Sequence, residues 1–459
     1  MKKVLILIAI VMAVVAFSNV MPSVFDPVPI PPSNQRMGGD PSLGLEYLIS
    51  GDYVKSGIPY NVFVMGMGKD KTNLLHRSGL NEKLSHEYTA VKASNGEIVV
   101  APNCLQCHAQ EFNGNLVMGL GNSFIDFTPN QKLNVRNLER VENFLKTTSP
   151  KKYEAAANFI TVGKTIGPLL HTAVRGVNAA DRLAAILAAH RDPETFAWND
   201  LPQLQLPAEV IPTDTPPWWL LKKKNAMFYN GFGRGDFGKF LMASNLLTVN
   251  DTSESREVDK HMPDVLAYIY SLEPPVYPGS LDNQLVGEGE KIFNRKCSSC
   301  HGTYGTIDTY PNLLIPAVDI QTDSLLSTSN YSSVQFVNWF NKSWFTKGEY
   351  PARLEPFNGY IAPPLDGIWV TAPYFHNGSV PTLEGVLNSK ERPTFWSRNF
   401  EKPQYDYQQV GWKFEVFQTA EKQNTYNTQV PGYSNTGHYF GDKLSAAERK
   451  AVIEYLKTL

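Results

Sequence analysis

The sequence predicts a mainly α-helical fold with long ordered loops and little β structure, built from two related units. Three observations lead to this prediction. The motif Cys-x-x-Cys-His occurs at 104–108 and again at 297–301, and the two copies use all four cysteines of the chain. An apolar helical segment follows each copy, at 263–272 and at 450–459. Proline (32) and tyrosine (21) are plentiful among the 459 residues, which favours ordered loops between the helices.

The repeated motif is typical of covalent c-type haem attachment. Residues three and four apart share one face of a helical turn. Both thiols can therefore reach the vinyl groups on one porphyrin edge, while the imidazole ligates the iron. A redox dithiol, half of a zinc site and structural disulfides are the alternatives, but they leave the histidine after each second cysteine unexplained. The residues predicted to hold two c-type haems are Cys104, Cys107, His108, Cys297, Cys300 and His301.

The N-terminal residues are typical of an export signal. Two lysines precede an apolar run at 4–17, and Ser18 follows it. The run is shorter than the roughly 20 residues that a spanning helix needs. We therefore expect a signal peptide at 1–18 and a periplasmic or secreted protein, with an uncleaved N-terminal membrane anchor as the alternative. No cysteine follows the run closely, which excludes a lipoprotein anchor.

Along the chain, periodicity and turn residues predict the following elements. A short helix is expected within 43–66, and a strand at 97–102 leads directly into the first motif. Helices are expected at 136–145 and at 179–190, where alanine favours the helical state. The segment 201–217 holds five prolines and is expected to be a loop.

Each predicted unit ends in a closing helix. The helix at 450–459 follows a capping box formed by Ser445 and Glu448. Cytochrome c folds end in this way, with a closing helix packed beside the helix that bears the haem, here expected at 288–293. The sequence therefore predicts two cytochrome-c-like haem domains.

Length and composition are consistent with this organisation. A chain of 459 residues is expected to form two or three domains. We expect an extended, proline-rich lead-in at 19–41, a first haem domain with helical elaborations at 42–275, and a second haem domain at 280–459. With 19% charged residues and a net charge of −2, the sequence gives no case for nucleic-acid binding.

Candidates for the sixth iron ligands come from the nine histidines. No methionine occurs after Met262, so a distal methionine downstream of the second motif is excluded, and His376 and His438 remain. His438 lies in a glycine-flanked loop just before the closing helix, from which its ring could cover the haem; a surface histidine is the alternative. His171 and His190, in helical segments with apolar neighbours, could ligate the first iron, although a core or surface role is more common.

The segment 371–383 resembles the signature of the bacterial dihaem cytochrome c peroxidase superfamily. Other segments are most similar to one branch of it, the rubber-oxygenase-like dihaem c-type cytochromes. These segments are 51–59, 102–108, 112–114, 222–229 and 437–441. The resemblance implies two cytochrome-c-like domains joined by a bridging tryptophan, here Trp218 or Trp219. The alternative is that both tryptophans belong to the core, where Trp is usually buried.

The resemblance also implies the iron ligands. Ordinary peroxidases have a distal methionine shortly after the histidine of this signature, but 385–390 holds none. This departure favours the oxygenase-like branch, in which the second haem has two histidine ligands, here His301 and His438. In that branch the His108 haem is open to oxygen and walled by an apolar aromatic residue, for which Phe228 and Phe232 are the candidates.

Two further residues acquire roles from the resemblance. His376 would lie near the iron without ligating it. Backbone groups of Thr371 and Pro373 would help to hold a calcium ion. The lysines at 222–224 could pair with haem propionates or steer an acidic electron partner, although a charged run is more often a solvated face.

Together these features predict an exported haem oxidoreductase of the peroxidase or oxygenase kind. It would activate O2 or H2O2 at the His108 haem, with the His301/His438 haem as electron relay and a small redox protein as electron donor or acceptor. The first alternative is a non-catalytic electron-transfer protein with both irons six-coordinate. A haem-based redox or gas sensor is the second, although the sequence shows no output module.

Overall fold

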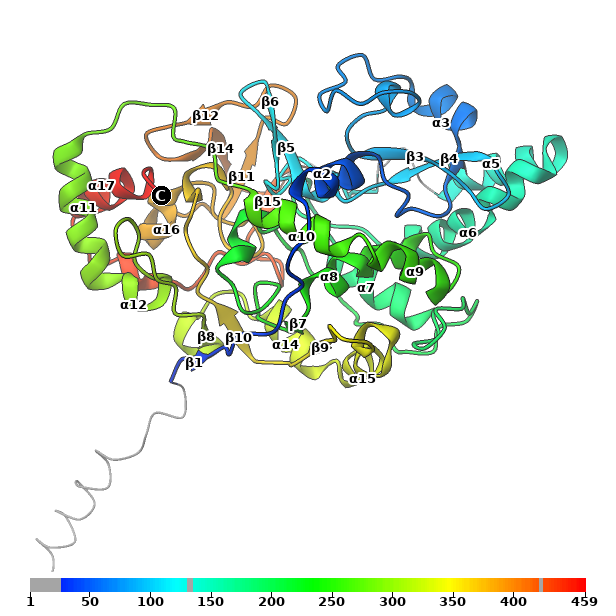
Figure 1. The fold of residues 1–459 in the computed structure, drawn as a ribbon. Helices are drawn as coiled ribbons and strands as arrows, with labels where there is room; N and C mark the ends of the chain where they lie inside the picture. The colour runs from blue at the N-terminus through cyan, green and yellow to red at the C-terminus, as the bar shows by residue number, and fades with distance from the viewer. Residues whose placement is uncertain (1–25, 130–134, 421–423) are drawn as a thin grey trace, which may run out of the picture.

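The computed structural model describes residues 26–129, 135–420 and 424–459. The expected signal peptide at 1–18 and the start of the lead-in lie outside these described residues. The architecture is mixed α/β, with 40% helix, 14% strand and several small sheets, so the prediction of a mainly α fold with little β structure is wrong. Figure 1 shows the short strands spread over the molecule, with α10 near its middle and other helices at both ends.

The strands were missed because each is only two to five residues long and most pair with partners far away in the sequence. Such segments are too short to show the alternating pattern of a half-buried strand. The strands are β1 (Val28–Pro29), β2 (Ile58–Pro59), β3 (Tyr88–Lys92), β4 (Ile98–Pro102), β5 (Ala109–Phe112), β6 (Asn115–Met118), β7 (Gly233–Gly235), β8 (Leu313–Pro316), β9 (Ala352–Leu354), β10 (Gly359–Ile361), β11 (Phe395–Arg398), β12 (Tyr405–Asp406), β13 (Gly411–Trp412), β14 (Phe414–Phe417) and β15 (Tyr426–Asn427). They form antiparallel sheets of two or three strands, ordered β1-β8-β10, β14-β11-β15, β12-β13, β2-β4-β3, β5-β6 and β7-β9.

The helices agree better with the sequence. They are α2 (Pro41–Ser50), α3 (Tyr60–Met67), α4 (Leu105–His108), α5 (Val135–Thr148), α6 (Pro150–Ile166), α7 (Ala180–Ala189), α8 (Phe237–Leu241), α9 (Thr252–Asp259), α10 (Met262–Ser271), α11 (Asn283–Lys296), α12 (Ser298–His301), α13 (Ala317–Ile320), α14 (Leu325–Ser332), α15 (Val334–Lys342), α16 (Leu383–Leu387) and α17 (Ala446–Leu456). Both predicted closing helices are confirmed as α10 and α17, and the predicted capping box at Ser445 is present. The predicted strand before the first motif is confirmed as β4.

Two helix pairs repeat the same close packing. Helix α10 packs on α2, and α17 packs on α11 (Figure 1). A glycine lies at each crossing. A Cβ atom on Gly44 would lie 2.0 Å from the carbonyl oxygen of Asp264, and one on Gly289 would lie 2.0 Å from that of Ala451. Only glycine lets these backbones approach so closely.

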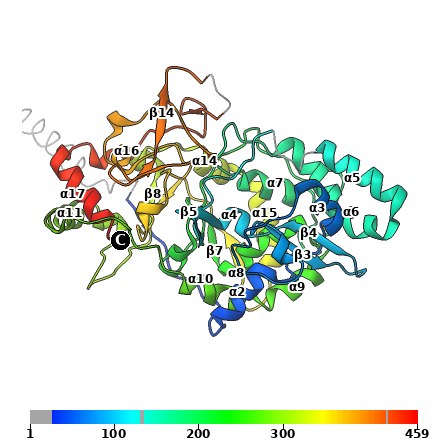
Figure 2. The same cartoon turned by 90° about the horizontal axis from the view of Figure 1, so that it is seen from above.

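The two halves of the chain are interleaved, so a clear division into two cytochrome-like domains is not seen. Strand β1 near the N-terminus pairs with β8, and β7 pairs with β9. The main hydrophobic cluster combines residues near Cys104 with Trp339 and Trp344 from the second half. Figure 2, viewed from above, agrees with Figure 1 in placing α11 and α17 at one end of the molecule and α5 and α6 at the other. In the described part of the chain, no helix combines the length and the apolar character that crossing a membrane requires.

Gly289→Ala should destabilise the protein by about 1–3 kcal/mol, because the added methyl group forces α11 and α17 apart. The matched control is Gly287→Ala on the same helix, where a Cβ atom meets nothing within 4 Å. That variant should be unchanged or more stable by about 0.5–1 kcal/mol. Denaturant unfolding of the holoprotein measures the free energy of unfolding of each variant. Equal effects of the two substitutions would contradict the close contact of α11 and α17 at Gly289.

Candidate haem sites

The first motif lies on a single helical turn, as predicted. Strand β4 leads into Cys104, and the turn is closed by hydrogen bonds from the backbone N–H groups of Cys107 (3.3 Å) and His108 (3.1 Å) to the carbonyl of Cys104. The side chain of Asn103 accepts the N–H of Leu105 at 2.9 Å and so caps the turn. This geometry puts both thiols and the imidazole on one local surface.

The thiol chemistry argues against the alternatives for these motifs. All four cysteines are free thiols, so no structural disulfide joins them. Within the described ranges, no group of three or more His, Cys, Asp or Glu side chains is arranged to hold a metal ion, which gives no support to a four-thiolate zinc site. The two motifs also belong to different hydrophobic clusters.

The His108 ring stacks on Trp218, with ring centroids 4.5 Å apart and an interplanar angle of 19°. Backbone hydrogen bonds of Gly119 hold the two residues beside each other. Gly119, after the β5–β6 hairpin, donates its N–H to the carbonyl of His108 and accepts the N–H of Trp218, both at 2.8 Å. Burial lowers the pKa of His108 to about 3, so the ring is neutral and retains a lone pair for a metal.

A small cavity lies beside Cys104. Its walls are mostly apolar, which suits a flat apolar cofactor. The lining residues are Tyr47, Leu48, Tyr53, Cys104, Trp218, Leu241, Met242, Asn245, Val258, Met262, Val265 and Ile269. The methionines were not singled out from the sequence. Met262 is the first residue of the closing helix α10, and this position is the signal that could have identified it.

Phe228 and Phe232, the predicted distal wall, do not line this cavity. Phe228 is 42% exposed and contacts Phe240 edge-on, with ring centroids 5.5 Å apart. Phe232 is buried and stacks on Phe336 at 6.4 Å. Phe232 does share the hydrophobic cluster that contacts Cys104. Their role at the first haem stays a prediction.

The second motif also forms one turn. Helix α11 leads into Cys297, whose carbonyl accepts the N–H groups of Cys300 (3.1 Å) and His301 (3.0 Å). The Nδ1 atom of His301 lies 2.8 Å from the carbonyl oxygen of Pro363. A carbonyl can only accept, so Nδ1 carries the proton and Nε2 is left unprotonated. Metal-bound histidines are held in this way.

His438 faces His301, with ring centroids 6.2 Å apart and an interplanar angle of 61°. Metal–imidazole bonds are about 2 Å long and the ring centre lies about 1 Å beyond the nitrogen, so two imidazoles on one metal ion have centroids roughly 6 Å apart. Burial lowers the pKa of His438 to about 3 and also lowers that of His301. Two neutral imidazoles at this spacing fit the two axial ligands of one haem iron.

His376 packs against aromatic neighbours, and its expected place near the iron stays a prediction. Its ring stacks on Tyr360 at 4.4 Å, and its Nε2 lies 3.3 Å from the Tyr360 hydroxyl. Its carbonyl accepts the N–H of Asp214 at 2.7 Å. His190 has its Nδ1 2.8 Å from the carbonyl of Asn199, and His171 lies in a loop after α6. Neither lines the cavity beside Cys104.

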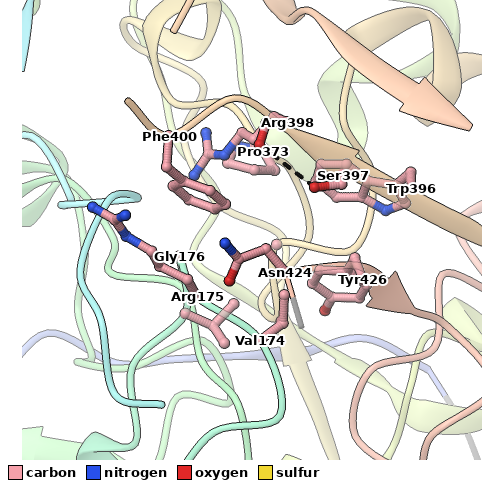
Figure 3. A pocket seen from close by; sticks show the side chains of 12 residues that line it. Val174, Arg175, Gly176, Pro373, Trp396, Ser397, Arg398, Phe400, Asn424 and Tyr426 are labelled. Carbon is pink, nitrogen blue, oxygen red and sulfur yellow. Dashed lines mark hydrogen bonds between the residues drawn. The ribbon is translucent and has the colours of Figure 1, made fainter. Parts of the chain in front are cut away.

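A second small cavity lies beside Pro373 (Figure 3). None of its lining residues is acidic. The guanidinium groups of Arg175 and Arg398 lie 4.8 and 4.9 Å from the centre of the Phe400 ring. Calcium requires oxygen ligands, and two nearby cations oppose its binding. This cavity therefore does not fit the calcium ion that the resemblance implied at Thr371 and Pro373.

Trp218 and Trp219 are neighbours in sequence but belong to different hydrophobic clusters. Trp218 packs in the cluster that contacts Cys104, and Trp219 in the cluster that contacts Cys297. The indole N–H of Trp219 donates to the carbonyl of Asp366 at 2.9 Å. The pair therefore connects the surroundings of the two motifs.

The lysines at 222–224 have different surroundings. Lys222 is exposed and pairs with Glu273, and Lys223 is half-buried and pairs with Asp308 and Asp366. Lys224 is buried, and its ammonium group forms no ion pair within the part of the chain that the structure describes. Burial lowers the pKa of Lys224 to about 8.

Comparison with known proteins supports a haem protein. Residues 359–397 match a family model described as RoxA-like, cytochrome c-like. Two proteins of Sinorhizobium fredii (strain NBRC 101917 / NGR234) are also similar. The uncharacterized protein y4iJ is 30% identical over 253 residues, which are 41% of this chain and 41% of y4iJ. The uncharacterized protein y4iM is 25% identical over 308 residues, which are 59% of this chain and 69% of y4iM.

The chain thus aligns with less than half the length of the first of these relatives. The family match covers the segment that holds Pro363 and His376 but neither Cys-x-x-Cys-His copy. It supports the resemblance to rubber-oxygenase-like cytochromes, implies a c-type haem, and indicates a haem-dependent oxidoreductase in general terms.

Proposed function

We propose that this protein is an exported dihaem c-type cytochrome oxidoreductase. It acts on O2 or H2O2 at a haem held by Cys104, Cys107 and His108. A second haem, held by Cys297 and Cys300, supplies or accepts electrons. One observation carries the proposal: His301 has a second imidazole opposite it, whereas His108 stacks on Trp218, which lines the apolar cavity beside Cys104.

The residues fit this division of labour. A bound c-type haem supplies an iron that exchanges electrons and, where one axial position is open, binds O2 or peroxide. His301 holds its Nδ1 proton on the carbonyl of Pro363, which would leave Nε2 free for the iron. His438 would supply the second imidazole. The apolar walls of the cavity beside Cys104 would exclude water from the first haem.

Electrons would pass between the haems through the adjacent tryptophans. Trp218 stacks on His108, and Trp219 packs in the cluster of the second motif, so a single peptide bond joins the two environments. The buried ammonium group of Lys224 would be compensated by a haem propionate, because an isolated buried charge is costly. We expect a small redox protein as the electron partner.

One observation favours the rival function of a non-catalytic electron carrier. Met242 and Met262 line the cavity beside Cys104. A thioether is a known axial haem ligand. If either sulfur occupied the sixth position of the His108 haem, both irons would be six-coordinate and closed to O2.

His438→Ala should convert the second haem completely from low spin to high spin, because the variant removes one of its two strong-field imidazoles. Optical absorption and magnetic circular dichroism of the ferric protein measure this change. His376→Ala is the matched control and should leave both haems unchanged in spin state. A second haem that stays low spin in His438→Ala would show that the ligand assignment is wrong.

In the reduced wild-type protein we expect one CO to bind per chain, at the His108 haem. Met242→Leu and Met262→Leu should change the CO affinity by less than about threefold, because neither sulfur ligates the iron in the proposed enzyme. Titration with CO measures both. Binding of CO only after one of these substitutions would establish the electron carrier instead.

A further inference from the structure

Arg392 ties together the segments around His438. Its guanidinium group donates only to backbone carbonyls, from two separate parts of the chain. The acceptors are Gly385 (2.7 Å), Val386 (3.2 Å), Asn435 (2.8 Å), Gly437 (2.7 Å) and His438 (3.4 Å). The first two belong to α16 and the other three to the loop that carries His438. One side chain thus joins this loop to the helix beside it.

The loop needs such support because its backbone is strained. Gly437 and His438 both have positive φ angles, +83° and +50°, and a non-glycine residue adopts this conformation only when its surroundings hold it there. The backbone N–H of His438 donates to the carbonyl of Ile320 at 2.8 Å. The buried Nδ1 of the ring itself has no hydrogen-bond partner among the described residues. The orientation of the ring therefore depends on its backbone.

No carboxylate forms a direct ion pair with Arg392 among the described residues, although Asp442 lies near enough to interact with its charge. The guanidinium group lies 4.9 Å from the centre of the Phe375 ring and 5.8 Å from that of Tyr439. Arg449, on α17, differs in this respect, because it pairs directly with Glu384 at 2.8 Å. A positive charge, only partly offset by Asp442, therefore lies beside His438, whose ring centroid is 6.1 Å from that of Phe375.

We propose that Arg392 is the positioning residue of the second haem. It holds His438 in the geometry that allows ligation, and its unpaired charge raises the reduction potential of that haem, since a nearby cation disfavours the more positive ferric state. This inference rests on the proposed function, because it requires His438 as an iron ligand. If the hydrogen bonds of the Arg392 guanidinium group are lost, the loop should become mobile and His438 should leave the iron.

Two substitutions separate position from charge. Arg392→Lys keeps the positive charge but loses the guanidinium group that donates to several carbonyls at once. Arg392→Met loses both the charge and these hydrogen bonds. In each variant the ratio of low-spin to high-spin second haem should fall by at least about tenfold. The reason is that hydrogen bonds from a charged donor are stronger than neutral ones, so their loss weakens the hold on the loop. The second haem should have a lower reduction potential in Arg392→Met than in Arg392→Lys. Arg449→Lys is the matched control and should match the wild type in spin state and potential.

Added imidazole distinguishes positioning from misfolding. It should restore the low-spin spectrum of Arg392→Met, because the iron site is intact and only the ligand has moved away. Failure of imidazole to restore that spectrum would mean a general structural role and overturn the inference. Arg392 variants that remain low spin, alongside a high-spin His438→Ala, would overturn it while leaving the proposed function in place. A low-spin His438→Ala would overturn both.

Discussion

The close approach of two partly buried imidazoles, those of His301 and His438, is the interaction on which our account depends. Their ring centroids lie 6.2 Å apart, and the two rings form no hydrogen bond with each other. The iron of the proposed second haem would bind one nitrogen of each ring. Several features of the second half serve this arrangement: the Pro363 carbonyl that orients one ring, the left-handed loop that presents the other, and the arginine that clamps the loop.

The two motifs have different surroundings, and on this difference we base the two proposed roles, reaction with O2 or H2O2 at the first haem and electron transfer at the second. Both motifs form the same helical turn, and both follow from the same sequence pattern. Their surroundings differ, because His301 meets another imidazole while His108 stacks on Trp218, a wall of the apolar cavity beside Cys104. An iron with two strong ligands suits electron transfer, and an iron with an open apolar side suits the binding of small oxidants. Trp218 and Trp219 connect the two environments within one peptide unit.

The sequence predicted the local features well and the tertiary ones poorly. The motif turns, both closing helices and strand β4 depend on residues close together in the chain, and each was predicted. The fold class was wrong, because strands of two to five residues pair across long sequence separations that no local pattern reveals. His438 was predicted as a ligand from its loop and from the resemblance. Arg392 was missed because its three acceptors in that loop lie 43, 45 and 46 residues away, and a lone arginine carries no local signal.

Low-temperature electron paramagnetic resonance of the purified ferric protein tests the central claim most directly. It reports the spin state of each haem iron separately, in the intact chain and without substitution. Our account predicts two signals of equal weight per chain, one high-spin from the iron on His108 and one low-spin from the iron between His301 and His438. Two low-spin signals would contradict an open catalytic iron, and two high-spin signals would contradict the paired imidazoles.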